Sequence, residues 1–141
     1  MSESKIVHFT RRERFSAAHK LWNPNWDSEK NHAVYGKCAH ENWHGHNYIL
    51  FVTVKGVPDD DTGMVIDLRD LKDIVKEKVI SKCDHKNLTL DVDFLTGKIS
   101  TAENVVIAIW DQIVGPLKEK GVDLHRVKLV ETENNIADYY G

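Results

Sequence analysis

The sequence predicts an α+β domain with a four-stranded antiparallel sheet and two helices in the order ββααββ. Two kinds of periodicity support this fold class. Apolar residues alternate with a period of two in segments 6–19 and 46–55, as in half-buried strands. They recur at helical spacing in segments 67–81 and 100–117. No linker, repeat or low-complexity stretch interrupts residues 1–141, so we expect a single domain.

The first half of the chain contains two predicted strands and a long loop between them. The first strand, residues 6–19, is expected to bulge near Arg11–Arg14. Residues 20–43 are rich in Asn, Asp, His and Trp, which is typical of a loop, and loops of this length are usually functional or disordered. The second strand begins at the histidines, and one of its faces collects His44, His46, Tyr48, Leu50, Val52 and Val54.

Capping signals locate the two helices. Asp67 is the predicted N-cap of the first, which should end near Ile80 or Ser81. Ser100 and Glu103 are spaced as a capping box for the second, and Gly115–Pro116 is expected to kink or weaken its last turn.

Strands over residues 124–132 and 136–140 complete the sheet. Two helices cannot cover both sheet edges, which favours edge-to-edge oligomerisation.

Composition excludes several classes of protein. The 141 residues are 41% hydrophobic and 29% charged, and no segment approaches the roughly 18 apolar residues of a membrane span. A net charge of −3 gives no overall attraction for nucleic acid. Residues 1–5 lack the apolar region of a secretory signal, so we expect a cytoplasmic location, with Cys38 and Cys83 as free thiols.

Three histidines are the predicted metal ligands. His44 and His46 are two positions apart in a strand, so their imidazoles share a face, and Gly45 between them has no side chain to crowd a metal. His19 ends the neighbouring antiparallel strand and supplies a third ligand. Three histidines with an open fourth position are typical of a catalytic zinc ion. We expect surface or loop positions for His8, His32, His40 and His125.

Cys38 has two alternative roles at such a site. As a fourth ligand it would close a structural site, but its position six residues before His44 is an unusual spacing for a zinc finger. We therefore expect Cys38 beside the metal and not bound to it. A nearby cation favours the thiolate, which suits the thiol to proton abstraction; the plainer interpretation is a small buried apolar residue.

Two acidic positions are open to two interpretations each. Asp84–His85 lies in a polar turn and is either a functional pair or an Asx turn. Glu131 continues the apolar face of Val127 and Leu129. It either accepts from a ligand with two parallel N–H donors or is a solvated strand end.

These motifs, in this order, resemble the 6-pyruvoyltetrahydropterin synthase family over nearly the whole chain. The motifs are Phe15–His19, Gly36–Cys38, His44–Tyr48, Asp84–Leu88, Thr101–Asn104 and Glu131–Thr132. The resemblance implies a tunnelling fold, in which three subunits join their sheets into a barrel and two trimers stack into a homohexamer.

The resemblance also implies an activity in tetrahydrobiopterin biosynthesis. The implied reaction converts 7,8-dihydroneopterin triphosphate, a small-molecule partner, to 6-pyruvoyltetrahydropterin with loss of inorganic triphosphate. Nucleic acid and membranes are not implied. The implied roles are zinc binding by His19, His44 and His46, general base for Cys38, a relay for Asp84 and His85, pterin anchoring by Glu131, and substrate binding by Thr101 and Glu103.

Some features separate this chain from its relatives. Trp43 stands where the family commonly has glycine, and Ala39–Glu41 differs from the usual Asn-rich insert. Residues 39–43 separate Cys38 from His44, a gap that is usually shorter in the relatives that form 6-carboxytetrahydropterin, so the pyruvoyl product is favoured.

Other functions remain as alternatives. They are the carboxy-forming reaction, a zinc- or pterin-binding module without turnover, and a zinc hydrolase, which would leave Cys38 and Glu131 without a role. The sequence does not rank the cations that could meet the triphosphate: Lys20, Lys37, Lys86, Arg11, Arg12 and Arg14.

Overall fold

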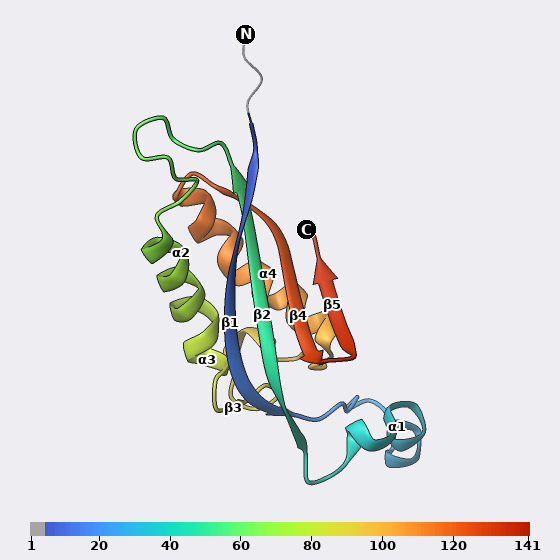
Figure 1. The fold of residues 1–141 in the computed structure, drawn as a ribbon. Coiled ribbons are helices and arrows are strands. Elements are labelled where there is room, and N and C mark those ends of the chain that lie inside the picture. Colours follow the sequence, from blue (N-terminus) through green and yellow to red (C-terminus); the bar gives the residue numbers. More distant parts are fainter. Residues whose placement is uncertain (1–4) are drawn as a thin grey trace.

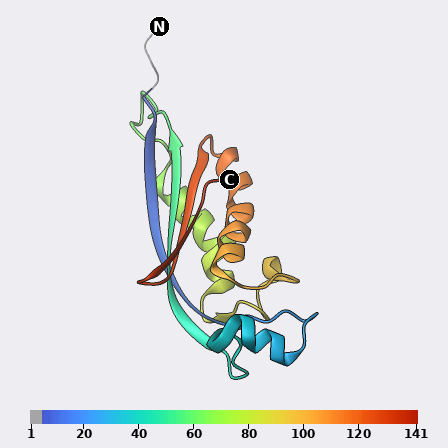
Figure 2. The same cartoon turned by 90° about the vertical axis from the view of Figure 1, so that its right-hand side faces the viewer.

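The fold is one five-stranded sheet with helices on one of its faces (Figures 1 and 2). This fold is seen in a computed structural model that describes residues 5–141. The expected cytoplasmic location was argued from residues 1–5, most of which lie outside the described residues. The strands are β1 (Val7–His19), β2 (His44–Gly56), β3 (Lys86–Asn87), β4 (Asp123–Thr132) and β5 (Asn135–Tyr139). The helices are α1 (Ser28–Tyr35), α2 (Leu68–Val75), α3 (Ser81–Cys83) and α4 (Ala102–Glu119). No helix in the described part of the chain is both long and apolar enough to cross a membrane.

The sheet is mixed, in the order β3-β1-β2-β4-β5. The four longer strands pair antiparallel, as predicted, but β3 pairs parallel to β1 through Ala17 and Ala18. The prediction of a four-stranded, wholly antiparallel sheet is therefore wrong, because a strand of two residues is too short to show a period. The α+β class, with a helical layer on a single sheet, is confirmed.

The register of β1 against β2 is unbroken, from Val7 opposite Gly56 to His19 opposite His44. A bulge near Arg11–Arg14 was thus a wrong prediction. The irregular positions lie in the pairings of β2 with β4 and of β4 with β5. Because the register is continuous, the parity that buries Phe15 also carries His19 to the helix-covered face at the end of the sheet.

Helix boundaries differ from the predictions at two places. Thr101, not Ser100, caps α4, by accepting from the backbone N–H of Asn104 at 3.2 Å, and the helix continues past Pro116. Asp67 caps α2 as predicted, but helical structure continues through a π turn at Lys76–Ile80 to the end of α3.

The expected long loop before β2 contains helix α1 and a 3₁₀ turn at Gly36–Ala39, so the loop prediction is wrong for residues 28–39. Helix α1 lies beyond one end of the sheet (Figure 1) and has no amphipathic pattern to reveal it. Polar contacts hold it instead. The Asn31 amide is 0% exposed, donates to the carbonyls of Asn23 and Asp27, and accepts from the N–H of Asn23.

We expect Asn31→Ala to lower the free energy of unfolding by about 2 kcal/mol, because it removes the buried amide that bonds the backbone of Asn23 and Asp27. Urea denaturation followed by circular dichroism measures the change. Asn25→Ala, at an exposed position in the same segment, is the matched control and should stay within about 0.5 kcal/mol of the parent chain. Equal losses in the two variants would contradict this role for Asn31.

Candidate active site

Three imidazoles meet where β1 and β2 end. The register places His19 opposite His44 and Ala17 opposite His46, so both strands contribute to one cluster. Their metal-ligating atoms all lie within 4.8 Å of one another. The sequence prediction that these three side chains come together is confirmed.

Each imidazole presents a buried nitrogen that has no hydrogen-bond partner among residues 5–141: Nε2 of His19, Nδ1 of His44 and Nε2 of His46. The other ring nitrogen of His19, Nδ1, lies 2.8 Å from the carbonyl oxygen of Ser100. Since a carbonyl can only accept, Nδ1 carries the proton and Nε2 keeps a free lone pair. A carbonyl that orients a histidine in this way is a common support of metal sites.

Burial favours the neutral form of His19 and His44. It lowers the pKa of His19 to about 4, with smaller contributions from His44 and His46, although the Ser100 carbonyl acts in the opposite direction. Burial also lowers the pKa of His44, followed by the nearby His46. Neutral imidazoles with converging lone pairs are the donor set that zinc binds. The site therefore fits a zinc ion held by three histidines.

Gly45 has a different role from the one predicted. Side chains alternate along β2, so a Cβ at Gly45 would point away from the imidazoles and lie 3.4 Å from the Ala17 carbonyl oxygen. The small residue eases the packing of the two strands on the uncovered face of the sheet. It does not make room for a metal.

Cys38 lies in the 3₁₀ turn that follows α1, is partly buried and is a free thiol, as is Cys83. The Cys38 carbonyl accepts from the N–H of Leu21 at 2.8 Å, which ties the turn to the chain just past His19. The group of side chains that could hold a metal within residues 5–141 contains the three histidines and not Cys38. The position of the thiol beside a metal stays a prediction.

The predicted substrate residues line one pocket of about 380 Å³, in which Thr101, Glu103 and Glu131 lie with Leu21. Thr101 follows Ser100, which supports His19, and Leu21 binds the Cys38 turn. The pocket is thus linked by backbone to both the histidine cluster and the thiol. Glu131 also helps to raise the pKa of the buried Tyr48, after burial itself.

Asp84 and His85 lie at the other side of β1. The Ser16 N–H donates to Asp84 at 2.9 Å, and His85 Nδ1 lies 3.0 Å from Asp84 Oδ2. The Ser16 hydrogen bond, followed by His85, holds the pKa of Asp84 below its usual range. The His85 side chain is 83% exposed, and its φ of 60° is in the left-handed region. The Asx turn of this segment is formed by Asn87, which accepts from the N–H groups of Thr89 and Leu90.

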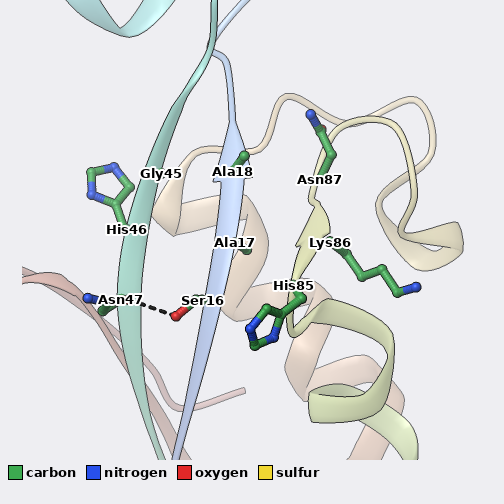
Figure 3. Close-up of a pocket in the computed structure, with 9 residues that line it drawn as sticks. All are labelled: Ser16, Ala17, Ala18, Gly45, His46, Asn47, His85, Lys86 and Asn87. Atoms are coloured by element: carbon green, nitrogen blue, oxygen red, sulfur yellow. Dashed lines mark hydrogen bonds between the residues drawn. The ribbon is translucent and has the colours of Figure 1, made fainter.

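The residues of the predicted relay lie in different elements, Cys38 in the turn after α1 and Asp84–His85 just before β3. Figure 3 shows His46 and His85 on opposite sides of the paired strands, beside an open pocket of about 500 Å³. The N–H of His85 is bonded to Ser16, whereas Cys38 is tied to Leu21, five positions further along the chain. At about 3.3 Å per extended residue, the strand segment from Ser16 to His19 alone spans about 10 Å.

Sequence reasoning missed Ser100 as part of the site and misread it as a helix cap. Its hydroxyl instead pairs with the Thr89 hydroxyl at 3.0 Å, while its carbonyl orients His19. Only the tertiary contact gives this role, because backbone carbonyls leave no signal in a sequence.

A helix-covered sheet with a three-imidazole cluster and a carboxylate-bearing pocket is typical of a small-molecule enzyme, with three histidines that could hold a metal. The family model for 6-pyruvoyl tetrahydropterin synthase matches residues 8–141. The chain belongs to this family of enzymes, which confirms the resemblance seen in the sequence.

Individual relatives agree over nearly the full length. The chain is 48% identical to the 6-pyruvoyl tetrahydrobiopterin synthase of Dictyostelium discoideum, covering 98% of each chain. It is 46% identical to the Homo sapiens protein of that name, over 94% of this chain and 90% of the relative. The structure of Caenorhabditis elegans 6-pyruvoyl tetrahydropterin synthase superimposes with a TM-score of 0.92 at 37% identity, covering 100% of this chain and 99% of the other.

Proposed function

We propose that this chain is a zinc-dependent lyase of tetrahydrobiopterin biosynthesis, which converts 7,8-dihydroneopterin triphosphate to 6-pyruvoyltetrahydropterin and inorganic triphosphate. The observation that carries the proposal is the convergence of three buried, unpartnered imidazole nitrogens next to the Glu131 pocket. The names of the similar proteins support the same activity.

Glu131 anchors the pterin ring in this proposal. The ring edge presents N3–H and a 2-amino group, two parallel donors that match the two oxygens of a carboxylate. Thr101 and Glu103 line the same pocket and complete the binding set. A ring held here directs its side chain along Leu21 toward the histidine cluster.

Cys38 acts as the general base. His19, His44 and His46 would hold a zinc ion, which would supply a Lewis acid for the hydroxyl groups and adjacent C–H bonds of the side chain. The Cys38 thiolate removes the C–H proton from the hydroxyl-bearing carbon next to the ring, the electron pair moves toward the C=N bond, and its nitrogen is protonated. The enol that results tautomerises to a ketone, which places the hydroxyl proton's equivalent on the ring carbon. Loss of the C–H proton from the second hydroxyl-bearing carbon then expels triphosphate from the terminal carbon, and the enol that forms tautomerises to the second ketone. The ring is thus reduced by its own side chain without an external hydride donor.

Asp84 and His85 relay protons to Cys38 across a contact between copies of the chain. Two observations favour this arrangement: the separation of the pair from Cys38 within one chain, and the exposure of His85 beside an open pocket at the β3 edge. Assembly into a homohexamer of two trimers would supply the neighbouring copy, since the sheet has free edges at β3 and β5. The hexamer and a cytoplasmic location stay predictions.

The products of the zinc-loaded enzyme test this function. We expect incubation with 7,8-dihydroneopterin triphosphate to give 6-pyruvoyltetrahydropterin and one equivalent of triphosphate, identified by mass spectrometry. Release of acetaldehyde would instead assign the 6-carboxy-forming reaction. Simple phosphate-ester hydrolysis would favour a zinc hydrolase, and unchanged substrate would leave a binding module.

A further inference from the structure

A second pocket lies beside the histidine cluster, and its lining combines two lysines with two tryptophans. It encloses about 300 Å³ and includes Lys20, Trp22, Trp43 and Lys98; we call it the Trp–Lys pocket. Lys20 Nζ lies 4.5 Å from the centre of the Trp22 ring and 5.4 Å from that of Trp43. Contacts of an ammonium group with two indole rings restrain the position of the charge.

The positive charge in this pocket is not neutralised. Within residues 5–141, neither Lys20 nor Lys98 forms an ion pair with a carboxylate. Thr89 lines the same pocket, and its hydroxyl pairs with that of Ser100. Two unpaired ammonium groups, one of them held by aromatic rings, suit an anionic ligand such as a phosphate chain.

The Trp–Lys pocket borders the residues that build the histidine cluster. Lys20 directly follows His19, and Trp43 directly precedes His44. Lys98 is two positions before Ser100, whose carbonyl orients His19. The same three chain segments therefore build the cluster and line this pocket.

The backbone at Trp43 supports a functional role for its ring. Its φ of 65° lies in the left-handed region, which is strained for a bulky residue. Residues held in such conformations concentrate at functional sites. Here the strained residue places an indole ring against Lys20.

We propose that the Trp–Lys pocket binds the triphosphate chain of the substrate, with Lys20 and Lys98 as its phosphate-binding cations. This inference rests on the proposed function. The triphosphate is attached to the carbon next to those that bear the side-chain hydroxyls. A substrate with its ring at Glu131 and its hydroxyls at the histidines therefore carries its phosphates to the border of the cluster, where the pocket lies. Sequence analysis left Lys20 as one of six alternatives and did not single out Lys98.

Binding of inorganic triphosphate to the zinc-loaded enzyme, measured by calorimetry, tests the inference directly. We expect Lys20→Met and Lys98→Met each to weaken binding about tenfold, the effect of losing one charged hydrogen bond. Lys118→Met is the matched control and should bind as the parent does. Lys118 is exposed near the end of α4, about 24 Å along the helix axis from Ala102.

A second variant separates the pocket from the stability of the fold. Trp43→Gly suits the left-handed backbone, so it should fold at least as well as the parent. We expect it to weaken triphosphate binding several-fold, because Lys20 loses one of its two rings. Its zinc content should equal that of the parent.

Turnover distinguishes failure of this inference from failure of the proposed function. For both lysine variants, KM for 7,8-dihydroneopterin triphosphate should rise about tenfold. Inhibition by dihydroneopterin, which lacks the phosphates, should be unchanged. A parent chain that turns over the substrate, with lysine variants that match it in KM and in triphosphate binding, would overturn the Trp–Lys assignment alone. A parent chain that does not turn over this substrate would overturn the function on which the assignment rests.

Discussion

We expect the turnover rate of Cys38→Ala to fall by a factor of between about 10² and 10⁴, while the variant keeps one zinc ion per chain. The rate falls because the general base is removed. The metal stays because the three histidine nitrogens converge without help from the thiol. Turnover of 7,8-dihydroneopterin triphosphate and elemental analysis of the same preparation measure the two quantities together.

Cys83→Ala is the matched control for this variant. Cys83 is fully buried among apolar residues, and burial raises its pKa to about 12, so it has no thiolate to offer near neutral pH. We expect near-parental turnover from the control. Loss of zinc from Cys38→Ala would identify the thiol as a fourth ligand and the site as structural. Full activity with zinc retained would require a different base.

How much of this site could be predicted depended on which residues leave a periodic signal. Strand parity was sufficient to predict that His19, His44 and His46 lie together, since one continuous register carries all three to the same face. Thr101, Glu103 and Glu131 were also brought together as the resemblance implied, in one pocket. In both cases ordinary secondary structure positions the side chains.

The missed features depend on tertiary contacts that have no local pattern. Strand β3 has two residues and exists because its backbone pairs with β1 at Ala17 and Ala18. Helix α1 has no apolar stripe and is held by the buried amide of Asn31. Ser100 looks like a helix cap but turns inward to orient His19.

The separation of Cys38 from Asp84 and His85 could not be predicted either. The resemblance implied one relay, but it did not state whether a single chain can form it. In the structure, the thiol belongs to the turn after α1 and the Asp84–His85 pair to the β3 edge, bonded to Ser16. In the proposed function, a second copy completes the relay that joins them.

Co-assembly of two inactive variants is therefore expected to restore activity. The turnover rates of the Cys38→Ala and His85→Ala chains should each fall at least about 100-fold. In a mixed oligomer, a site that takes its thiol from a His85→Ala chain and its histidine from a Cys38→Ala chain is complete. With equal, random mixing, about one site in four has this composition, so about a quarter of the parental rate should return.

Co-expression of the two variants with different affinity tags, followed by purification on both tags, isolates the mixed oligomers for the rate measurement. The matched control pairs Cys38→Ala with the double variant Cys38→Ala, His85→Ala, in which no site can be complete, and it should stay inactive. Mixed oligomers that form but remain as slow as the control would show that Asp84 and His85 do not serve Cys38 across a contact between copies. The zinc-binding histidines and the Glu131 pocket would be unaffected by that result, because their residues meet within one chain.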